Sequence, residues 1–113
     1  GTPIGYGGTE VLNSPTRVAV LPVGYYDGFD RRLSRQAEIL VHGHRCKVLG
    51  TVCMNMTMVD VSRVPGIKRG DRVTLIGQDG AQHIHVRELA QKAGTIHWEI
   101  ISRIASHLPR LVV

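Results

Sequence analysis

The chain has 113 residues, the length of one domain, and its 42% hydrophobic and 20% charged residues are typical of a globular protein. Its 14 Lys and Arg residues against 9 Asp and Glu give a net charge of +5, compatible with nucleic acid, an anionic small molecule or an acidic protein as partner. No apolar run approaches the roughly 20 residues that span a membrane, and no signal peptide is visible, so we expect a cytoplasmic protein.

The first residues, "GTPIGYGG", begin without a methionine and place Tyr6 between two glycines. We expect residues 1–113 to form one domain that is the last part of a longer protein. Glycine on both sides allows sharp bending of the backbone and close approach of other groups. A phenol has a pKa of about 10, and it is a poor base at neutral pH unless its surroundings lower that pKa. By residue type alone, Tyr6 is therefore interpreted as a surface or edge tyrosine.

Strand patterns fill the first two thirds of the chain. Valine, isoleucine and leucine gather in runs that end at glycine, which is typical of short strands between turns. The runs cover residues 16–24, 37–43, 44–62 and, after a Pro-Gly turn and a Gly-Asp turn, 64–77. His42-Gly43-His44 is the predicted turn between the second and third runs. This spacing predicts a mainly β fold, namely a small β-barrel or a Greek-key-like domain.

The segment "GYYDGFDRR" combines a turn signal with side chains that could meet an anion. Asp27-Gly28 is the turn signal, and Arg31 follows within reach of the same loop. Arginine offers a planar fork of donors to carboxylates and phosphates, so this loop could present Tyr25 and Arg31 to such a group. A hairpin tip with solvated charges is the plainer interpretation.

Two features of the third run bear on its chemistry. Alternation in "VCMNMTMV" puts Met54, Met56 and Met58 on one strand face, which we expect to face the core and not to bind a soft metal. Cys46 and Cys53 have no CxxC spacing, and we expect both to be reduced, buried packing residues.

Other site chemistry finds little support. The His-x-His pairs at 42–44 and 83–85 have no further ligand nearby in the sequence, so we expect no metal site. No glycine-rich segment has dinucleotide or P-loop spacing. The three lysines stand in polar settings, so none is a candidate for a buried Schiff-base lysine. The domain is therefore not expected to perform carbonyl chemistry alone. Those lysines are Lys47, Lys68 and Lys92.

Two short helices are predicted near the C-terminus. Residues 85–94 carry apolar side chains at helical spacing and end on a glycine, which is a C-terminal cap signal. Thr95 is the predicted N-cap of a second helix over residues 95–108, with isoleucines along one face, and Pro109 ends it. Residues 110–113 could form a last strand.

In order and spacing, these segments resemble the C-terminal domain of bacterial alanine racemase over nearly the whole chain. The motifs that carry the resemblance are "IGYGGT", "GYYDGFDR", "GTVCMN", "GDRVTLIG", "TIHWEIISRIA" and the late "PR". It implies a two-domain enzyme whose N-terminal (β/α)8 barrel carries pyridoxal 5′-phosphate on a lysine. It also implies a head-to-tail homodimer, in which each active site joins the barrel of one subunit to the C-terminal domain of the other.

The resemblance also assigns roles to single residues. Tyr6 would be the base that removes the α-proton from L-alanine, while the barrel's lysine serves the opposite face. Tyr25, Asp27 and Arg31 would line the substrate channel. Met54 matches the position whose backbone N–H meets the substrate carboxylate.

Three positions depart from the family pattern. Asn55, at the substrate-binding position after Met54, replaces an aspartate and so removes a negative charge. Trp98 replaces a late tyrosine near the cofactor phosphate; its indole can donate a hydrogen bond but cannot ionise. Tyr26 stands where a small residue is usual, and nothing in the sequence explains it.

The expected function is therefore interconversion of L- and D-alanine for peptidoglycan precursors, with the domain inactive by itself. A racemase for serine or another small amino acid on the same scaffold remains an alternative. A basic β-barrel module that binds RNA is another, which the net charge favours and the 4% aromatic content disfavours. Steeply salt-dependent RNA binding would favour that second alternative. A purely structural dimerisation domain is the third.

Overall fold

A computed structural model describes residues 2–4, 10–12, 15–104 and 108, and over these the chain is mainly β with two short helices near the C-terminus. The mainly β class predicted from the sequence is confirmed. The strands are β1 (Thr2–Ile4), β2 (Glu10–Leu12), β3 (Val18–Leu21), β4 (Glu38–Val41), β5 (His44–Leu49), β6 (Thr57–Asp60), β7 (Val73–Thr74), β8 (Gly77–Asp79) and β9 (Gln82–Ile84). The helices are α1 (Val86–Ala93) and α2 (His97–Ser102), with two single-turn 3-10 helices, η2 (Tyr25–Asp27) and η3 (Arg31–Leu33).

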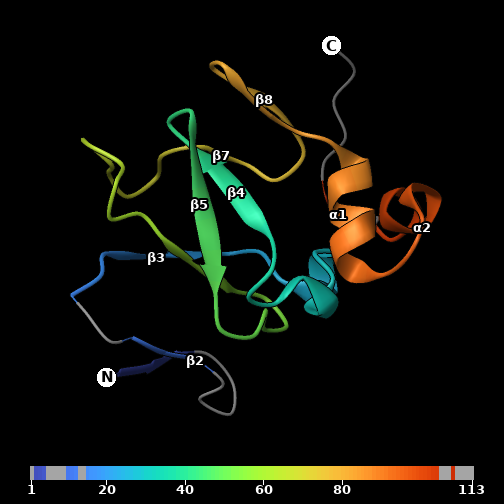
Figure 1. Ribbon diagram of the computed structural model, residues 1–113, viewed down its shortest axis with the longest axis horizontal. Coiled ribbons are helices and arrows are strands. Elements are labelled where there is room, and N and C mark those ends of the chain that lie inside the picture. Colours follow the sequence, from blue (N-terminus) through green and yellow to red (C-terminus); the bar gives the residue numbers. More distant parts are fainter. Residues whose placement is uncertain (1, 5–9, 13–14, 105–107, 109–113) are drawn as a thin grey trace.

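The central sheet has five antiparallel strands in the order β3-β6-β5-β4-β7. Strands β4, β5 and β6 are successive neighbours, and β7 returns by a long connection to lie beside β4, which is the Greek-key order. The sheet is strongly curled, so that β3 crosses beneath β5 in Figure 1. Two separate hairpins, β1-β2 and β8-β9, lie on either side of it. The predicted Greek-key arrangement is therefore confirmed.

The hairpin of β4 and β5 forms where the sequence predicts it. His42 and Gly43 connect the strands and have φ angles of +50° and +76°, the left-handed pair that suits the twist of a two-residue hairpin turn. Ile39, Leu40 and Val41 of β4 are all fully buried, because the curled sheet and its surroundings cover both faces of this strand.

The two helices pack at one end of the sheet, beside η2 and η3 (Figure 1). Helix α1 turns Leu89, Ala90 and Ala93 into the core, and α2 contributes Ile100. Gly94 ends α1 with a φ of +74°, as the cap signal predicts, because a left-handed residue closes the last turn. No helix within the described part of the chain has the length and apolar character that a membrane crossing requires.

The third predicted run is interrupted, and the expected methionine core face is wrong. After β5 the backbone turns at Gly50, whose φ is +64°, and residues 50–56 form no regular strand before β6 begins at Thr57. Alternation counted through this break therefore assigned the wrong face. None of the three methionines is buried, since Met54 is exposed and Met56 and Met58 are half-buried. The buried side chains nearby are those of Val52, Cys53, Thr57 and Val59. Both cysteines are free and buried, as expected.

The second helix is shorter than predicted and has a different cap. Helix α2 begins after Ile96, which makes no side-chain cap bond, while the Thr95 hydroxyl donates to the Glu99 carboxylate. The predicted N-cap role of Thr95 is therefore wrong. The regular helix ends at Ser102, and the predicted strand at residues 110–113 lies outside the described residues. The β8-β9 hairpin was not predicted.

Candidate functional site

Two segments that are distant in the sequence meet through their backbones at the candidate site. The N–H of Tyr25 donates to the carbonyl oxygen of Cys53 at 3.0 Å, and the N–H of Tyr26 donates to that of Met54 at 2.8 Å. Gly24 permits this contact, because a Cβ there would lie 2.1 Å from the Cys53 carbonyl oxygen. The structure therefore places the predicted channel loop directly against the predicted substrate-binding loop.

Side-chain hydrogen bonds hold the start of the channel loop in shape. The buried hydroxyl of Thr57 donates to the carbonyl oxygen of Val23 at 2.6 Å, which ties the segment between β3 and η2 to β6. The carboxylate of Asp27 accepts the N–H of Gly24 at 3.0 Å and closes the turn of η2. Asp27 was predicted to line a channel; in the structure its carboxylate closes this turn.

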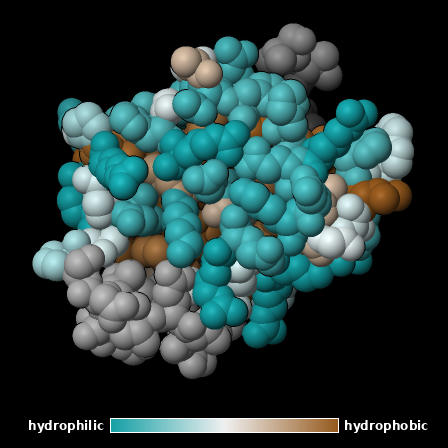
Figure 2. Space-filling view, in the orientation of Figure 1, coloured by the Kyte–Doolittle hydropathy of each residue, from teal (hydrophilic) through white to brown (hydrophobic). Residues whose placement is uncertain are grey.

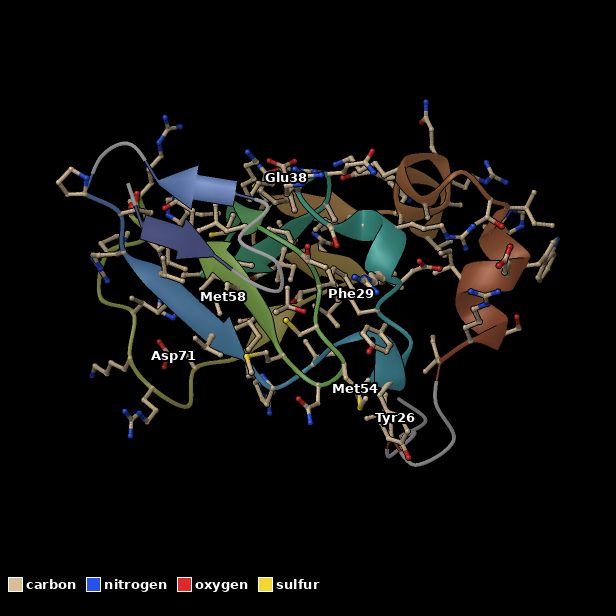
Figure 3. The ribbon with its side chains drawn as sticks, turned by 90° about the horizontal axis from the view of Figure 1, so that it is seen from below. Tyr26, Phe29, Glu38, Met54, Met58 and Asp71 are labelled. Atoms are coloured by element: carbon tan, nitrogen blue, oxygen red, sulfur yellow. The ribbon has the colours of Figure 1, made fainter. Side chains whose placement is uncertain are left out.

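Three side chains of the joined loops are exposed. Tyr25 is 38% exposed, Tyr26 66% and Met54 47%. Figure 3 shows Tyr26 and Met54 together at one edge of the molecule, with Phe29 further inside. Asn55, next to Met54, is also exposed. Such a grouped exposure of large side chains marks a surface suited to contact with another body.

A hollow of about 430 Å³ opens beside this edge. Arginine, aspartate and tyrosine residues border it, and the Arg31 guanidinium can meet an anionic group such as a carboxylate, while Arg103 pairs with Asp30 and Glu99. Tyr25 and Arg31, which the family resemblance assigns to the substrate channel, both line it. Its lining residues are Tyr25, Gly28, Asp30, Arg31 and Arg103.

Four charged residues join the channel loop to α2. The carboxylate of Asp30, only 8% exposed, accepts Arg32 Nη2 at 2.8 Å and Arg103 Nη1 at 3.4 Å. Glu99 of α2 accepts Arg32 Nη2 at 3.2 Å and Arg103 Nη2 at 2.7 Å. The side-chain hydrogen bond from Arg32 holds the pKa of Asp30 below its ordinary value. The pKa of Glu99 is also lowered, first by the Thr95 hydroxyl and then by the two arginines.

The remaining predicted residues are less closely connected to this site. Trp98, on α2, is 66% exposed, and its ring centroid lies 4.7 Å from that of His97. Further exposed apolar side chains around α2 are Ile96 and Ile101. Figure 2 shows a mostly hydrophilic face on which hydrophobic surface appears in small patches, one of them at the end where α2 lies. Tyr6 lies outside the described residues.

Two features of the site are not foreseen from the sequence, namely the four-residue charge cluster and the Thr57 hydrogen bond. Asp30 and Arg32 stand close together in the segment "FDRR", but their partners Glu99 and Arg103 follow far later in the chain. Charge type alone does not pair residues across such a distance, so only the fold shows the cluster. The polar residue Thr57 inside an apolar run was the one available signal for its buried hydrogen bond.

The lysines of this chain are not placed to bind pyridoxal phosphate. Such a site needs a lysine that can form a Schiff base in a protected pocket. Lys47 and Lys68 are exposed, and the ammonium of Lys92 binds the carboxylate of Glu88 at 3.2 Å. Across the described ranges, no three His, Cys, Asp or Glu side chains come together to hold a metal ion.

The known proteins that this chain resembles all belong to one family. The family model "Alanine racemase, C-terminal domain" matches residues 1–112. The alanine racemase of Leptospira interrogans is 48% identical over 110 residues, which are 97% of this chain and 28% of that protein. The alanine racemase of Halothermothrix orenii is 46% identical over 110 residues, again 97% of this chain and 29% of that protein.

Solved structures agree with the family match. The alanine racemase from Streptomyces coelicolor A3(2) superposes with a TM-score of 0.90 at 32% identity, over 98% of this chain and 29% of that one. The alanine racemase from E. faecalis gives a TM-score of 0.88 at 35% identity, over 96% of this chain and 28% of that one. The chain therefore spans less than a third of the length of the relatives it matches. The resemblance seen in the sequence motifs is confirmed.

Proposed function

This chain belongs to the family of alanine racemase C-terminal domains, and from that premise we propose that it is the C-terminal domain of a pyridoxal-phosphate-dependent alanine racemase. The match of the family over residues 1–112 carries this proposal. The whole enzyme interconverts L- and D-alanine in the cytoplasm and supplies D-alanine for peptidoglycan precursors. The isolated domain is inactive.

The proposal requires a second domain, because the chain has no lysine placed for Schiff-base chemistry. The relatives are more than three times as long as this chain, which leaves room for an N-terminal (β/α)8 barrel that holds the cofactor on its own lysine. The outward-facing side chains of Tyr25, Tyr26 and Met54 suit a surface that meets that barrel across a homodimer interface.

Within that assembly, Tyr6 acts on the substrate's α-carbon. Bound pyridoxal phosphate withdraws electrons from this carbon and makes its proton acidic. The phenolic oxygen of Tyr6 takes that proton from L-alanine and returns one when the reaction runs in reverse. Groups of the barrel lower the pKa of Tyr6 so that the phenol can serve as a base near neutral pH.

The joined loops guide and hold the substrate. Tyr25 and Arg31 line the hollow through which the amino acid enters, and the Arg31 guanidinium attracts its carboxylate. The backbone N–H of Met54 then meets the carboxylate in the site. The hydrogen bonds from Tyr25 to Cys53 and from Tyr26 to Met54 support this role, because they fix the two loops relative to each other.

Serine or another small amino acid is the second candidate substrate. Asn55 in place of an aspartate and Trp98 in place of a tyrosine change the charge and the width of the region around the substrate. Both side chains are exposed and could reach a ligand held by another domain. Relative kcat/KM values for alanine and serine decide between these substrates.

The direct test is racemisation by the full-length protein that contains this chain. The purified, cofactor-loaded protein is given L-alanine, D-alanine, L-serine or L-2-aminobutyrate, and the opposite enantiomer is measured by chiral chromatography. We expect alanine to be converted fastest and the 113-residue chain alone to convert nothing. Absence of racemisation, together with tight and salt-dependent binding of RNA, would contradict the proposal and favour a binding module.

A further inference from the structure

Neither side of the hollow beside Tyr25 is held by a long element of regular structure. Helix α2 has only six residues, and the opposite side consists of the single-turn helices η2 and η3. Helices this short have little stability of their own, so tertiary contacts must fix their positions. The contacts that bridge the two sides therefore determine the shape of the hollow.

The charge cluster of Asp30, Arg32, Glu99 and Arg103 is such a bridge. Asp30 and Arg32 belong to the loop, while Glu99 belongs to α2 and Arg103 follows its end. Each of the two guanidiniums contacts both Asp30, which belongs to the loop, and Glu99, which belongs to α2. Asp30 also accepts the backbone N–H of Arg32 at 2.8 Å, so its carboxylate is fixed to the loop. The four residues thus form a closed network.

A steric contact reinforces the same bridge. Gly28 has a φ of +104°, and a Cβ at this position would lie 2.5 Å from the carbonyl oxygen of Arg103. The loop backbone therefore touches the end of α2 directly. Arg103 contributes to both features, and its side chain also lines the hollow together with Tyr25 and Arg31.

We propose that Asp30, Arg32, Glu99 and Arg103 form a clamp that sets the width of the substrate hollow and so the enzyme's preference for a small amino acid. Asp30 and Glu99 are positioning residues, because they act through Tyr25, Arg31 and α2 and not on the reacting atoms. This inference rests on the proposed function. When the clamp is weakened, α2 separates from the loop, the hollow widens, and the carboxylate of alanine is held less closely.

The chain contains a matched control network. Arg45 of β5 binds Glu38 at 3.1 Å and Glu88 at 2.8 Å, and Lys92 binds Glu88 at 3.2 Å. This network also has four charged residues and also joins a helix to another element. None of its members lines the hollow. Glu88→Gln therefore weakens a comparable network without affecting the proposed clamp.

The experiment compares Asp30→Asn, Arg103→Ala, Arg103→Lys and Glu88→Gln in the full-length, cofactor-loaded protein. We expect KM for L-alanine to rise about tenfold in the first two variants while kcat stays within about twofold, because the clamp positions the substrate's entry and not the chemistry. The kcat/KM ratio of L-2-aminobutyrate to L-alanine should rise in the same variants. Arg103→Lys should raise KM less than Arg103→Ala does, and Glu88→Gln should have the wild-type KM.

A second measurement does not depend on activity. Hydrogen–deuterium exchange of the full-length protein reports opening of the loop, because the amides of Tyr25 and Tyr26 are hydrogen-bonded to the 53–54 loop. We expect peptides over residues 24–33 and 97–103 to exchange faster in Asp30→Asn and Arg103→Ala, and at the wild-type rate in Glu88→Gln.

The outcomes separate this inference from the proposed function. If the wild-type protein does not racemise alanine, the proposed function fails. Hydrogen–deuterium exchange then still tests the clamp, because exchange in Asp30→Asn at the wild-type rate would show that no clamp exists. If wild type is active and the clamp variants keep its KM and selectivity, the clamp is refuted and the proposed function stands. A KM increase of equal size in Glu88→Gln would show a general loss of stability and would also refute the clamp.

Discussion

The N–H of Tyr26 donates a 2.8 Å hydrogen bond to the carbonyl oxygen of Met54, so two loops from different parts of the chain share one edge of the domain. The neighbouring bond from Tyr25 to Cys53, at 3.0 Å, makes the contact a short two-bond ladder. Because backbone groups form it, the contact depends on how closely the two chains approach and not on the tyrosine side chains.

Gly24→Ala tests this close approach. The new Cβ would lie 2.1 Å from the Cys53 carbonyl oxygen and 2.6 Å from that of Met54, so one loop must move. We expect a loss of about 1–3 kcal/mol in the free energy of unfolding, as for other overpacked positions. Chemical denaturation measures it. Gly66→Ala is the control, because a Cβ there meets nothing within 4 Å and only the positive φ of that position adds strain. Equal losses of unfolding free energy in both variants would contradict the steric account.

Thr57→Val tests the hydrogen bond that ties the loop to β6. The valine keeps the shape of threonine but leaves the carbonyl oxygen of Val23 without the hydroxyl that donates to it at 2.6 Å. We expect a loss of about 1–3 kcal/mol, the desolvation cost of an unpaired buried polar group. Thr57→Ser keeps the hydroxyl and should lose about 0.8 kcal/mol for one methyl group. A serine variant less stable than the valine variant would show that packing, and not this bond, matters.

The fold could be predicted from the sequence where local signals and tertiary structure agree. The β4-β5 hairpin followed from His42-Gly43 between two apolar runs, and the end of α1 followed from Gly94. The prediction failed at residues 50–56, because Gly50 turns the chain inside a run whose alternation looks continuous. It also failed at Thr95, whose hydroxyl pairs with the Glu99 side chain instead of capping the backbone.

The candidate site was predicted only in part. The motif order indicated that Tyr25, Arg31 and Met54 belong to one site, and the structure places Tyr25 beside Arg31 in one hollow and against the 53–54 loop. The pairing of Asp30 with Arg103 could not be foreseen, since it depends on where α2 docks. Distant charge pairs carry no local sequence signal, so the fold itself was needed to find them.

The stability contributed by Asp30 should depend on pH in a defined direction. Arg32 lowers the pKa of Asp30 below its ordinary value of 3.8, so the folded state favours the ionised carboxylate. This contribution is complete above 3.8 and is lost as the pH falls through the lowered pKa of the folded state. We expect Asp30→Asn to be less stable than wild type at pH 7 and to approach it as the pH falls below 3.8, as thermal unfolding across pH would show. A difference between the two proteins that stays constant through the acid range would contradict this cause.

Trp98→Tyr introduces on α2 the tyrosine that the family resemblance expects at this position. Trp98 is 66% exposed, so the exchange should change the free energy of unfolding by no more than about 0.5 kcal/mol. In the full-length protein we expect kcat/KM for L-alanine to rise a few-fold, about 1 kcal/mol of transition-state stabilisation, because the smaller phenol supplies the hydroxyl that the proposed function expects beside the cofactor phosphate. Steady-state racemisation measures this; Trp98→Phe, which lacks the hydroxyl, is the control. Equal gains in both variants would assign the effect to size alone.

The central claim is that this chain supplies the base for the L side of the reaction, and Tyr6→Phe in the full-length protein tests it most directly. The measurement is exchange of the α-proton for deuterium, starting separately from L-alanine and from D-alanine in deuterated water. We predict that exchange from L-alanine falls by about 10²–10⁴, the usual contribution of a general base, while exchange from D-alanine is retained. Unchanged exchange from both enantiomers would contradict the claim and leave the domain without a catalytic role.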